Sequence, residues 1–145
     1  MAFKASADLK TEIVNEVVRR MAGTLGTGGT CVLKIYPGTQ PDNAETAYTL
    51  GPLCIIEGIG WGDGTSGATA GSIDFVAGRT GTAISTGQAG WARMETFGTG
   101  GNGSSAVFRV DGECGLDSTC AFVFYTLDIE VGDTVTVYQS NLFMT

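Results

Sequence analysis

Short β-prone segments separated by glycine-rich turns constrain the fold of this chain more than any other feature of its sequence. The clearest case lies between residues 91 and 110. There Trp91, Arg93 and Glu95 alternate with small or apolar neighbours, and a second β-prone run covers 106–110. The connection Gly98–Ser105 is rich in glycine, asparagine and serine. This combination predicts two antiparallel strands joined by a long hairpin loop.

Similar runs recur along the rest of the chain, and the 23 glycines fall mostly between them as turn residues. Further strands are predicted at 30–36, 47–56, 72–76, 83–85, 121–127, 134–138 and 142–144. Pro52 should interrupt the second of these at an edge or a bulge. Many short strands with turn signals predict a mainly β fold, an antiparallel β-sandwich or jelly-roll-like domain with one N-terminal amphipathic α-helix.

The helix is predicted over residues 8–22. Apolar residues recur there every four positions, namely Leu9, Ile13, Val17 and Met21. Either Ser6 or Asp8 is suited to cap its N-terminus, and Gly23 should end it. We expect residues 1–29 to form this helix with a glycine-rich linker, and residues 30–145 to form the β-domain. The apolar stripe then packs either on the protein's own sheet or on a neighbouring subunit.

Charge excludes two classes of partner. The chain has 145 residues, a net charge of −7 and eight lysines and arginines in all. Binding to nucleic acid or to an anionic membrane surface needs clustered basic residues, so neither partner is expected. The sequence also lacks the run of about 20 apolar residues that spans a bilayer. Its first residues lack the apolar core of a signal peptide, which predicts synthesis in the cytoplasm.

Few residues suggest catalysis or metal binding. The chain contains no histidine, which removes Ser-His-Asp and Cys-His arrangements and the usual zinc spacings. Cys31 and Cys54 lie in apolar runs and should be buried. Cys114 and Cys120 are expected to be free thiols, with a small disulfide-closed loop as the alternative. We therefore expect no enzyme activity, no metal and no cofactor.

Two apparent motifs favour plainer interpretations. Glycines 98, 100 and 103 match the dinucleotide-binding pattern, but that pattern must be followed by a helix, and here a β-prone run follows. Asp111, Glu113 and Asp117 place three carboxylates close together, yet their spacing lacks the order of a calcium loop. A solvated turn is the better interpretation of these acids.

Two tryptophans suggest carbohydrate binding as a function. Trp61 lies within Gly60-Trp-Gly-Asp-Gly64, which has the composition of a sugar-binding turn, although a tryptophan between turn glycines is more often a core or edge residue. If Trp61 or Trp91 binds a glycan, its replacement by alanine should abolish binding while the fold stays intact.

The order of several segments resembles a known family. After the amphipathic helix come Leu33-Lys-Ile-Tyr-x-Gly38-Thr-Gln-Pro41, Thr82-Ala83, Gly90-Trp-Ala-Arg93 and Asp128-Ile-x-Val-Gly-Asp-Thr-Val135. This order is similar to that of small structural proteins of tailed bacteriophages and prophages. The resemblance implies a virion component on the capsid surface, a decoration (cement) protein that binds the major capsid protein and is often trimeric. The loop 98–105 and the segment 114–120 depart from that pattern.

The candidate interface residues follow from the helix stripe and the two glycine-rich loops. They are Ile13, Val17, Met21, Gly62, Gly64, Gly67, Gly98, Gly100, Asn102 and Gly103. Glycine in such loops allows a partner's backbone to approach closely. A neck, tail or head-fibre component and a carbohydrate-binding adhesion module are the alternative functions.

Overall fold

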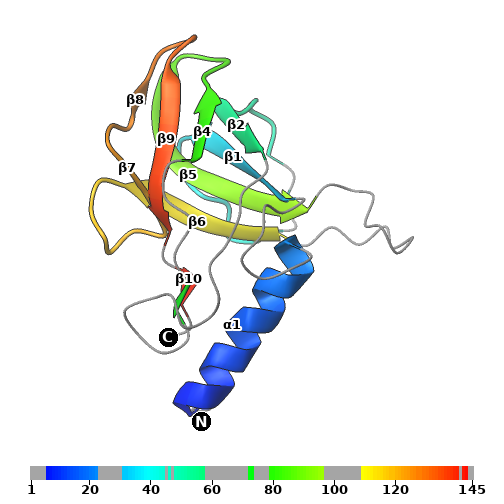
Figure 1. The fold of residues 1–145 in the computed structure, drawn as a ribbon. Helices are drawn as coiled ribbons and strands as arrows, with labels where there is room; N and C mark the ends of the chain where they lie inside the picture. The colour runs from blue at the N-terminus through cyan, green and yellow to red at the C-terminus, as the bar shows by residue number, and fades with distance from the viewer. Residues whose placement is uncertain are drawn as a thin grey trace.

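The computed structural model describes residues 6–22, 31–44, 46, 48–57, 72–73, 79–96, 109–140 and 142–143. Within these ranges the chain forms one helix and ten strands (Figure 1). They are α1 (Ala7–Ala22), β1 (Cys31–Pro37), β2 (Cys54–Glu57), β3 (Ser72–Ile73), β4 (Arg79–Thr82), β5 (Gly87–Thr96), β6 (Arg109–Gly115), β7 (Phe122–Phe124), β8 (Asp128–Ile129), β9 (Thr134–Ser140) and β10 (Leu142–Phe143). No helix of the described ranges is long and apolar enough to cross a membrane.

Eight of the strands form one strongly curved sheet. Its order is β2-β1-β5-β6-β7-β9-β4, β8 pairs with β5 beside this path, and β3 pairs with β10 separately. All pairings are antiparallel except that of β6 with β7. The sheet curls until its end strands meet, where Cys54 and Ala83 form an isolated bridge (Figure 1). The prediction of a mainly β, sandwich-like domain with one N-terminal helix is confirmed, and its sheet forms a nearly closed barrel.

The predicted antiparallel pairing of two central strands is confirmed, but the second strand, β6, covers 109–115 rather than 106–110, and the connection 98–105 lies outside the described ranges. Strands β5 and β6 pair antiparallel, with Trp91 opposite Glu113, and β5 also pairs with β1 and β8. Gly90 allows β5 to pass close to the turn after β1, because a Cβ atom at this position would lie 1.9 Å from the carbonyl oxygen of Gly38. A larger residue would therefore push the two segments apart.

Other strand boundaries differ from the prediction. The strand expected at 47–56 begins only at Cys54, after Pro52, which cannot donate a backbone hydrogen bond. The run 83–85 contributes only the bridge at Ala83. The pattern does not predict β4, whose sequence Arg-Thr-Gly-Thr has no apolar alternation, or the two-residue β8. Of the strand expected at 72–76, residues 74–76 lie outside the described ranges.

Helix α1 begins at a serine cap. The backbone N–H of Leu9 donates to Oγ of Ser6 at 3.3 Å, and that of Lys10 donates to the Ser6 carbonyl at 3.0 Å, so Ser6 rather than Asp8 is the cap. The helix projects from one end of the barrel and contacts β3 and β5 (Figure 1). Leu9 and Ile13 remain 52% and 37% exposed. The described part of the apolar stripe is therefore only partly covered within one chain, and both predicted arrangements, packing on the protein's own sheet and packing on a neighbouring subunit, stay open.

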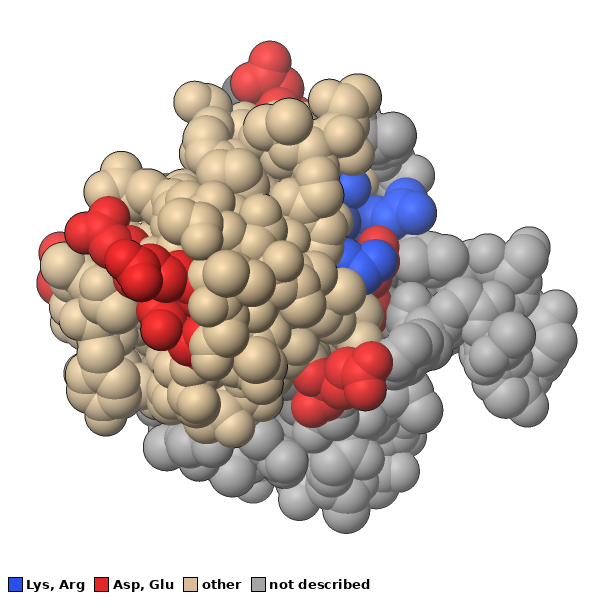
Figure 2. All heavy atoms as spheres, turned by 90° about the horizontal axis from the view of Figure 1, so that it is seen from above, with Lys and Arg blue, Asp and Glu red and all other residues tan. Residues whose placement is uncertain are grey.

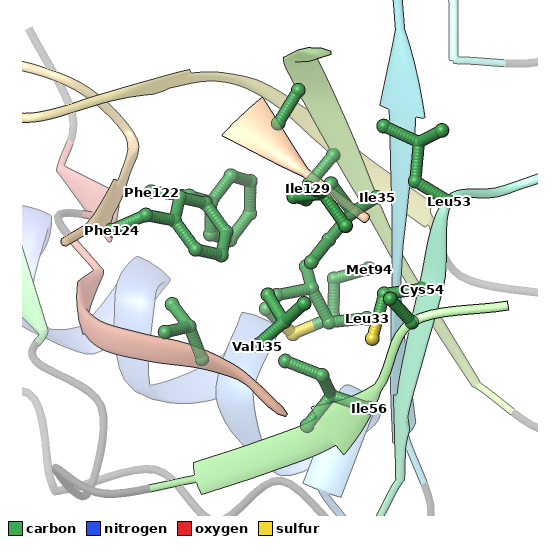
Figure 3. Packing of buried hydrophobic residues seen from close by; sticks show 14 residues of the cluster. Leu33, Ile35, Leu53, Cys54, Ile56, Met94, Phe122, Phe124, Ile129 and Val135 are labelled. Atoms are coloured by element: carbon green, nitrogen blue, oxygen red, sulfur yellow. The ribbon is translucent and has the colours of Figure 1, made fainter. Parts of the chain in front are cut away.

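The hydrophobic core fills the barrel (Figure 3). Leu33 and Ile35 of β1 and Met94 of β5 are fully buried, and they alternate with residues on the outer face. Phe122 and Phe124 close the core from the opposite wall (Figure 3). Burying an aliphatic or aromatic side chain of this size contributes about 1.5–3 kcal/mol. None of the described side chains of α1 belongs to this core.

Candidate interaction surfaces

The outer face of β1, β5 and β6 carries side chains arranged in rows by the strand register. The rows across the three strands are Tyr36–Trp91–Glu113, Lys34–Arg93–Asp111 and Val32–Glu95–Arg109. Residues directly opposite on neighbouring strands lie close enough to interact, and opposite charges there are favourable. The outer face of these strands therefore carries a layer of aromatic rings and ion pairs, whereas their inner face is apolar.

Arg93 lies at the centre of that layer and is only 5% exposed. Its Nε and Nη2 donate to the two carboxylate oxygens of Asp111, each at 2.7 Å, and Nη1 donates to the carbonyl of Thr46 at 3.0 Å. The guanidinium carbon lies 5.3 Å from the ring centroid of Trp91, within cation–π range. The hydrogen bonds to Asp111 raise the pKa of Arg93 above its usual value. Because the N–H groups of its guanidinium donate to groups of the protein itself, Arg93 has a structural role.

Three aromatic rings form a closed cluster beside Arg93. Trp91 stacks on Tyr36 at 4.6 Å between centroids, and Tyr48 meets both rings edge-on at 4.9 Å and 5.1 Å. The Tyr48 hydroxyl donates to the carbonyl of Pro37 at 2.7 Å, which fastens the segment after β1 over the cluster. Trp91 has no exposed surface. The proposed role of Trp91 in glycan binding is wrong, because a ligand cannot reach a fully covered ring.

A second ion network lies beside this cluster. Glu95 accepts hydrogen bonds from Lys34 and, at 3.2 Å, from Nε of Arg109. Burial opposes ionisation of this carboxyl, but the hydrogen bonds and charges of Lys34 and Arg109 outweigh it and hold the pKa of Glu95 below its usual value. Figure 2 shows one face of the molecule, on which the blue cationic side chains gather on one side next to red carboxylates. The two cations of this network therefore share one carboxylate, that of Glu95.

The solvated turn predicted for the acids at 111–117 is wrong for Asp111 and Glu113, which lie in strand β6 because this segment pairs with β5, and the side chain of Asp111 is buried; only Asp117 lies in an exposed turn. Asp111 binds Arg93, Glu113 is exposed, and Asp117 accepts hydrogen bonds from the hydroxyl and the N–H of Thr119. Those bonds from Thr119 lower the pKa of Asp117. Within the described ranges no group of three potential ligands could hold a metal ion.

Cys54, Cys114 and Cys120 form no disulfide. Cys54 is fully buried, as predicted, whereas the side chain of Cys31 lies outside the described residues. Cys114 and Cys120 are not bonded to each other. Burial, together with the charges of Cys120 and Glu113, raises the pKa of Cys114 well above its usual value. Its thiol is accordingly a poor nucleophile near neutral pH.

An open surface lies on the other side of the barrel, where β7 and β9 run side by side (Figure 1). Tyr125 and Tyr138 stack there with centroids 5.1 Å apart and ring planes 17° apart. They are 75% and 39% exposed. Tyr125 also borders a shallow hollow of about 70 Å³, whose polar lining includes Asp128 and Asp133. No pattern in the sequence predicts this pair.

The predicted interface residues fall into two groups. Ile13 lies on the projecting helix, and so do Val17 and Met21, although the side chains of the last two are outside the described residues. The glycine-rich loop residues all lie outside the described ranges: Gly62, Gly64, Gly67, Gly98, Gly100, Asn102 and Gly103. Trp61 lies outside them as well. Of the predicted interface, the structure therefore describes only part of the apolar stripe of the helix.

Comparisons with known proteins give no match, whether with protein-family models, with curated proteins or with solved structures. The resemblance to phage structural proteins consequently stays a prediction from the order of segments. The function has to be argued from the surfaces described above.

Proposed function

We propose that this protein is a non-enzymatic structural component of a virion, a decoration (cement) protein that reinforces a bacteriophage head by binding between neighbouring subunits. The observation that supports this proposal is the projecting helix α1, whose apolar residues Leu9 and Ile13 are exposed (Figure 1). The partners are the major capsid protein and further copies of this chain, in the trimers that such proteins often form.

The exposed face of α1 needs a partner for energetic reasons. Leu9 and Ile13 are four residues apart and so lie on the same side of the helix. A helix of 16 residues is marginally stable in water on its own and gains most of its stability from packing an apolar face. Among the described elements, α1 makes its main contacts with β3 and β5, and these leave Leu9 and Ile13 partly exposed, so we assign the remaining packing to a neighbouring subunit.

The barrel suits a structural role for a different reason. Its core is well packed, and on the outer face of β1, β5 and β6 the buried cation Arg93 is fully paired. A protein that binds only the assembled lattice stabilises it by mass action, so each copy has to contribute only a small free energy. The net charge of −7 keeps a particle covered with many copies soluble.

The test compares particles with and without the protein. Heads from which it has been deleted should release DNA at a lower temperature than complete heads, and they should regain stability when the purified chain is added back. The number of copies per particle separates a decoration protein, with hundreds, from a neck or tail ring, with about a dozen. Unchanged head stability, with the protein located at the neck, tail or a head fibre, would contradict the cement role.

A single substitution links that test to α1. Ile13→Asp should abolish rebinding to depleted heads, since an unpaired carboxylate would be buried in the new interface. The isolated chain should stay folded and lose no more than about 1–2 kcal/mol of folding free energy, because the Ile13 side chain is partly exposed there. Glu12→Gln, at the adjacent exposed position, is the matched control and should rebind normally. Normal rebinding of the Ile13→Asp variant would mean that α1 is not the docking element.

A further inference from the structure

The open surface around Tyr125 has a composition unlike that of the covered outer face on β1, β5 and β6. It combines an exposed aromatic pair with carboxylates and hydroxyl groups, and the described residues that line its hollow include no lysine or arginine, unlike the surroundings of Trp91, where Arg93 lies. We infer that this surface, formed by Tyr125, Tyr138 and the outer face of β9, binds a neutral oligosaccharide.

The tyrosine pair provides a flat platform. Its two rings stack on each other, so Tyr138 supports the plane of Tyr125 while Tyr125 keeps 75% of its surface exposed. The face of an aromatic ring carries partial negative charge, and the C–H groups on the apolar side of a pyranose ring carry the complementary positive charge. A sugar ring lying on Tyr125 would cover this apolar surface without having to enter a deep pocket.

Hydrogen-bond acceptors lie next to the platform. The hollow beside Tyr125 is lined by Asp128 and Asp133. Oδ1 of Asp128 accepts from Nε2 of Gln88 at 3.1 Å, and Oδ2 of Asp133 accepts from the N–H of Glu130 at 2.9 Å. These bonds orient both carboxylates, and a carboxylate has about four lone-pair positions, so acceptor capacity remains for sugar hydroxyls.

A row of hydroxyl groups extends the surface along the barrel. Thr134, Thr136 and Tyr138 alternate with the core residues of β9 and therefore share its outer face. Strand β4 adds Thr82 opposite Thr134 and Thr80 opposite Thr136. From Thr134 to Tyr138 the strand covers about 13 Å at the usual rise per residue. The surface thus fits an extended oligosaccharide better than a single sugar.

The same features disfavour other ligands. Anionic groups would be repelled by Asp128 and Asp133. A quaternary ammonium ion is held by rings that surround it as a cage, whereas Tyr125 and Tyr138 lie nearly parallel, 17° apart. A hollow of about 70 Å³ is also far smaller than pockets that enclose small molecules, which measure about 300–1,000 Å³.

The inference is tested by saturation-transfer NMR on the full chain. The probes are the methyl glycosides of glucose, galactose and mannose, with cellotetraose and maltotetraose. We expect transfer from tyrosine ring protons to sugar C–H protons, and tighter binding of a tetrasaccharide than of its monosaccharide. Tyr125→Ala should weaken binding at least about tenfold, while Tyr125→Phe, which keeps the ring face, should stay within about threefold. Asp128→Ala should weaken it by about threefold.

Leu50→Ala is the control, since Leu50 is also exposed but belongs to the segment between β1 and β2. This variant should bind as the parent does. The inference is overturned if none of the neutral probes receives saturation, or if binding survives Tyr125→Ala. Binding of tetramethylammonium without binding of any sugar would also overturn it and would identify a cation site. None of these outcomes depends on whether the protein stabilises a phage head.

Discussion

Two groups of aromatic residues lie on the outside of the same barrel and differ in almost every other respect. Trp91 and its neighbours are covered by the segment that Tyr48 fastens to Pro37, and the adjacent charges are paired. Tyr125 and Tyr138 are stacked but open to solvent. The comparison shows that an aromatic cluster serves stability when a loop covers it, and is available for recognition when none does. We call Tyr125 and Tyr138 the open pair. The covered cluster consists of the rings of Trp91, Tyr36 and Tyr48 together with the adjacent charged residues, which are Arg93, Asp111 and Glu95.

The largest expected effect comes from breaking the ion pair of the covered cluster. Asp111→Ala leaves the guanidinium of Arg93 buried without its carboxylate and should cost about 3–5 kcal/mol of unfolding free energy. The measurement is urea denaturation followed by tryptophan fluorescence. Replacing both partners, Arg93→Met with Asp111→Leu, should cost clearly less than Asp111→Ala alone. A single variant as stable as the parent would show that this charge is solvated rather than covered.

Protonation of Glu95 should weaken the covered cluster at low pH. The pKa of this carboxyl is below its usual value of 4.5 in the folded protein, so its stabilising effect is complete above that pH and is lost as the pH falls through the folded value. At neutral pH, Glu95→Gln should cost about 1–2 kcal/mol. The loss of stability below pH 4.5 should be less steep in the variant than in the parent. Identical acid profiles would contradict the role given to Lys34 and Arg109.

A smaller effect is expected from loosening the cover itself. Tyr48→Phe keeps the edge-on ring contacts but removes the hydroxyl that donates to the Pro37 carbonyl. It should cost about 1 kcal/mol. Hydrogen exchange should report faster opening of residues 48–53 while the β5–β6 ladder remains protected. Equal protection in parent and variant would show that other contacts hold this segment in place.

The open pair should contribute least to stability. Tyr125→Ala removes a side chain that is 75% exposed, so the unfolding free energy should change by no more than about 0.5 kcal/mol. The thermal midpoint, followed by circular dichroism, checks this expectation. A loss of several kcal/mol would place Tyr125 among structural residues and remove the contrast with Trp91.

The sequence was most informative where side-chain alternation directly reflects burial. The runs around Leu33 and Trp91 predicted β1 and β5, because alternate residues of each strand face the core. Strand β4 escaped prediction because Arg-Thr-Gly-Thr becomes a strand only through pairing with β9. Periodicity also cannot show what covers an outer face. Trp91 therefore suggested a sugar-binding residue although the structure buries it.

The two candidate surfaces also differ in whether a local sequence pattern predicts them. The stripe through Ile13 was visible in the sequence because helical spacing is local. Tyr125 and Tyr138 are 13 positions apart and meet across an irregularity in the β7–β9 register. A local pattern contains no signal for such a pairing. The one available hint was that Tyr138 continues the alternation of Thr134 and Thr136 on the polar side of its strand.

The near closure of the barrel affects how copies of the protein contact one another at high density. An unpaired sheet edge is a template on which another chain can add a strand, and this is a common route to aggregation. Here the two end strands of the sheet face each other, and a Cβ atom at Gly81 would lie only 2.6 Å from the carbonyl oxygen of Ile55. Glycine at this seam therefore allows the two edges to approach each other closely. In copies of the protein held at high density, the two edges at this seam are then closed to strand addition.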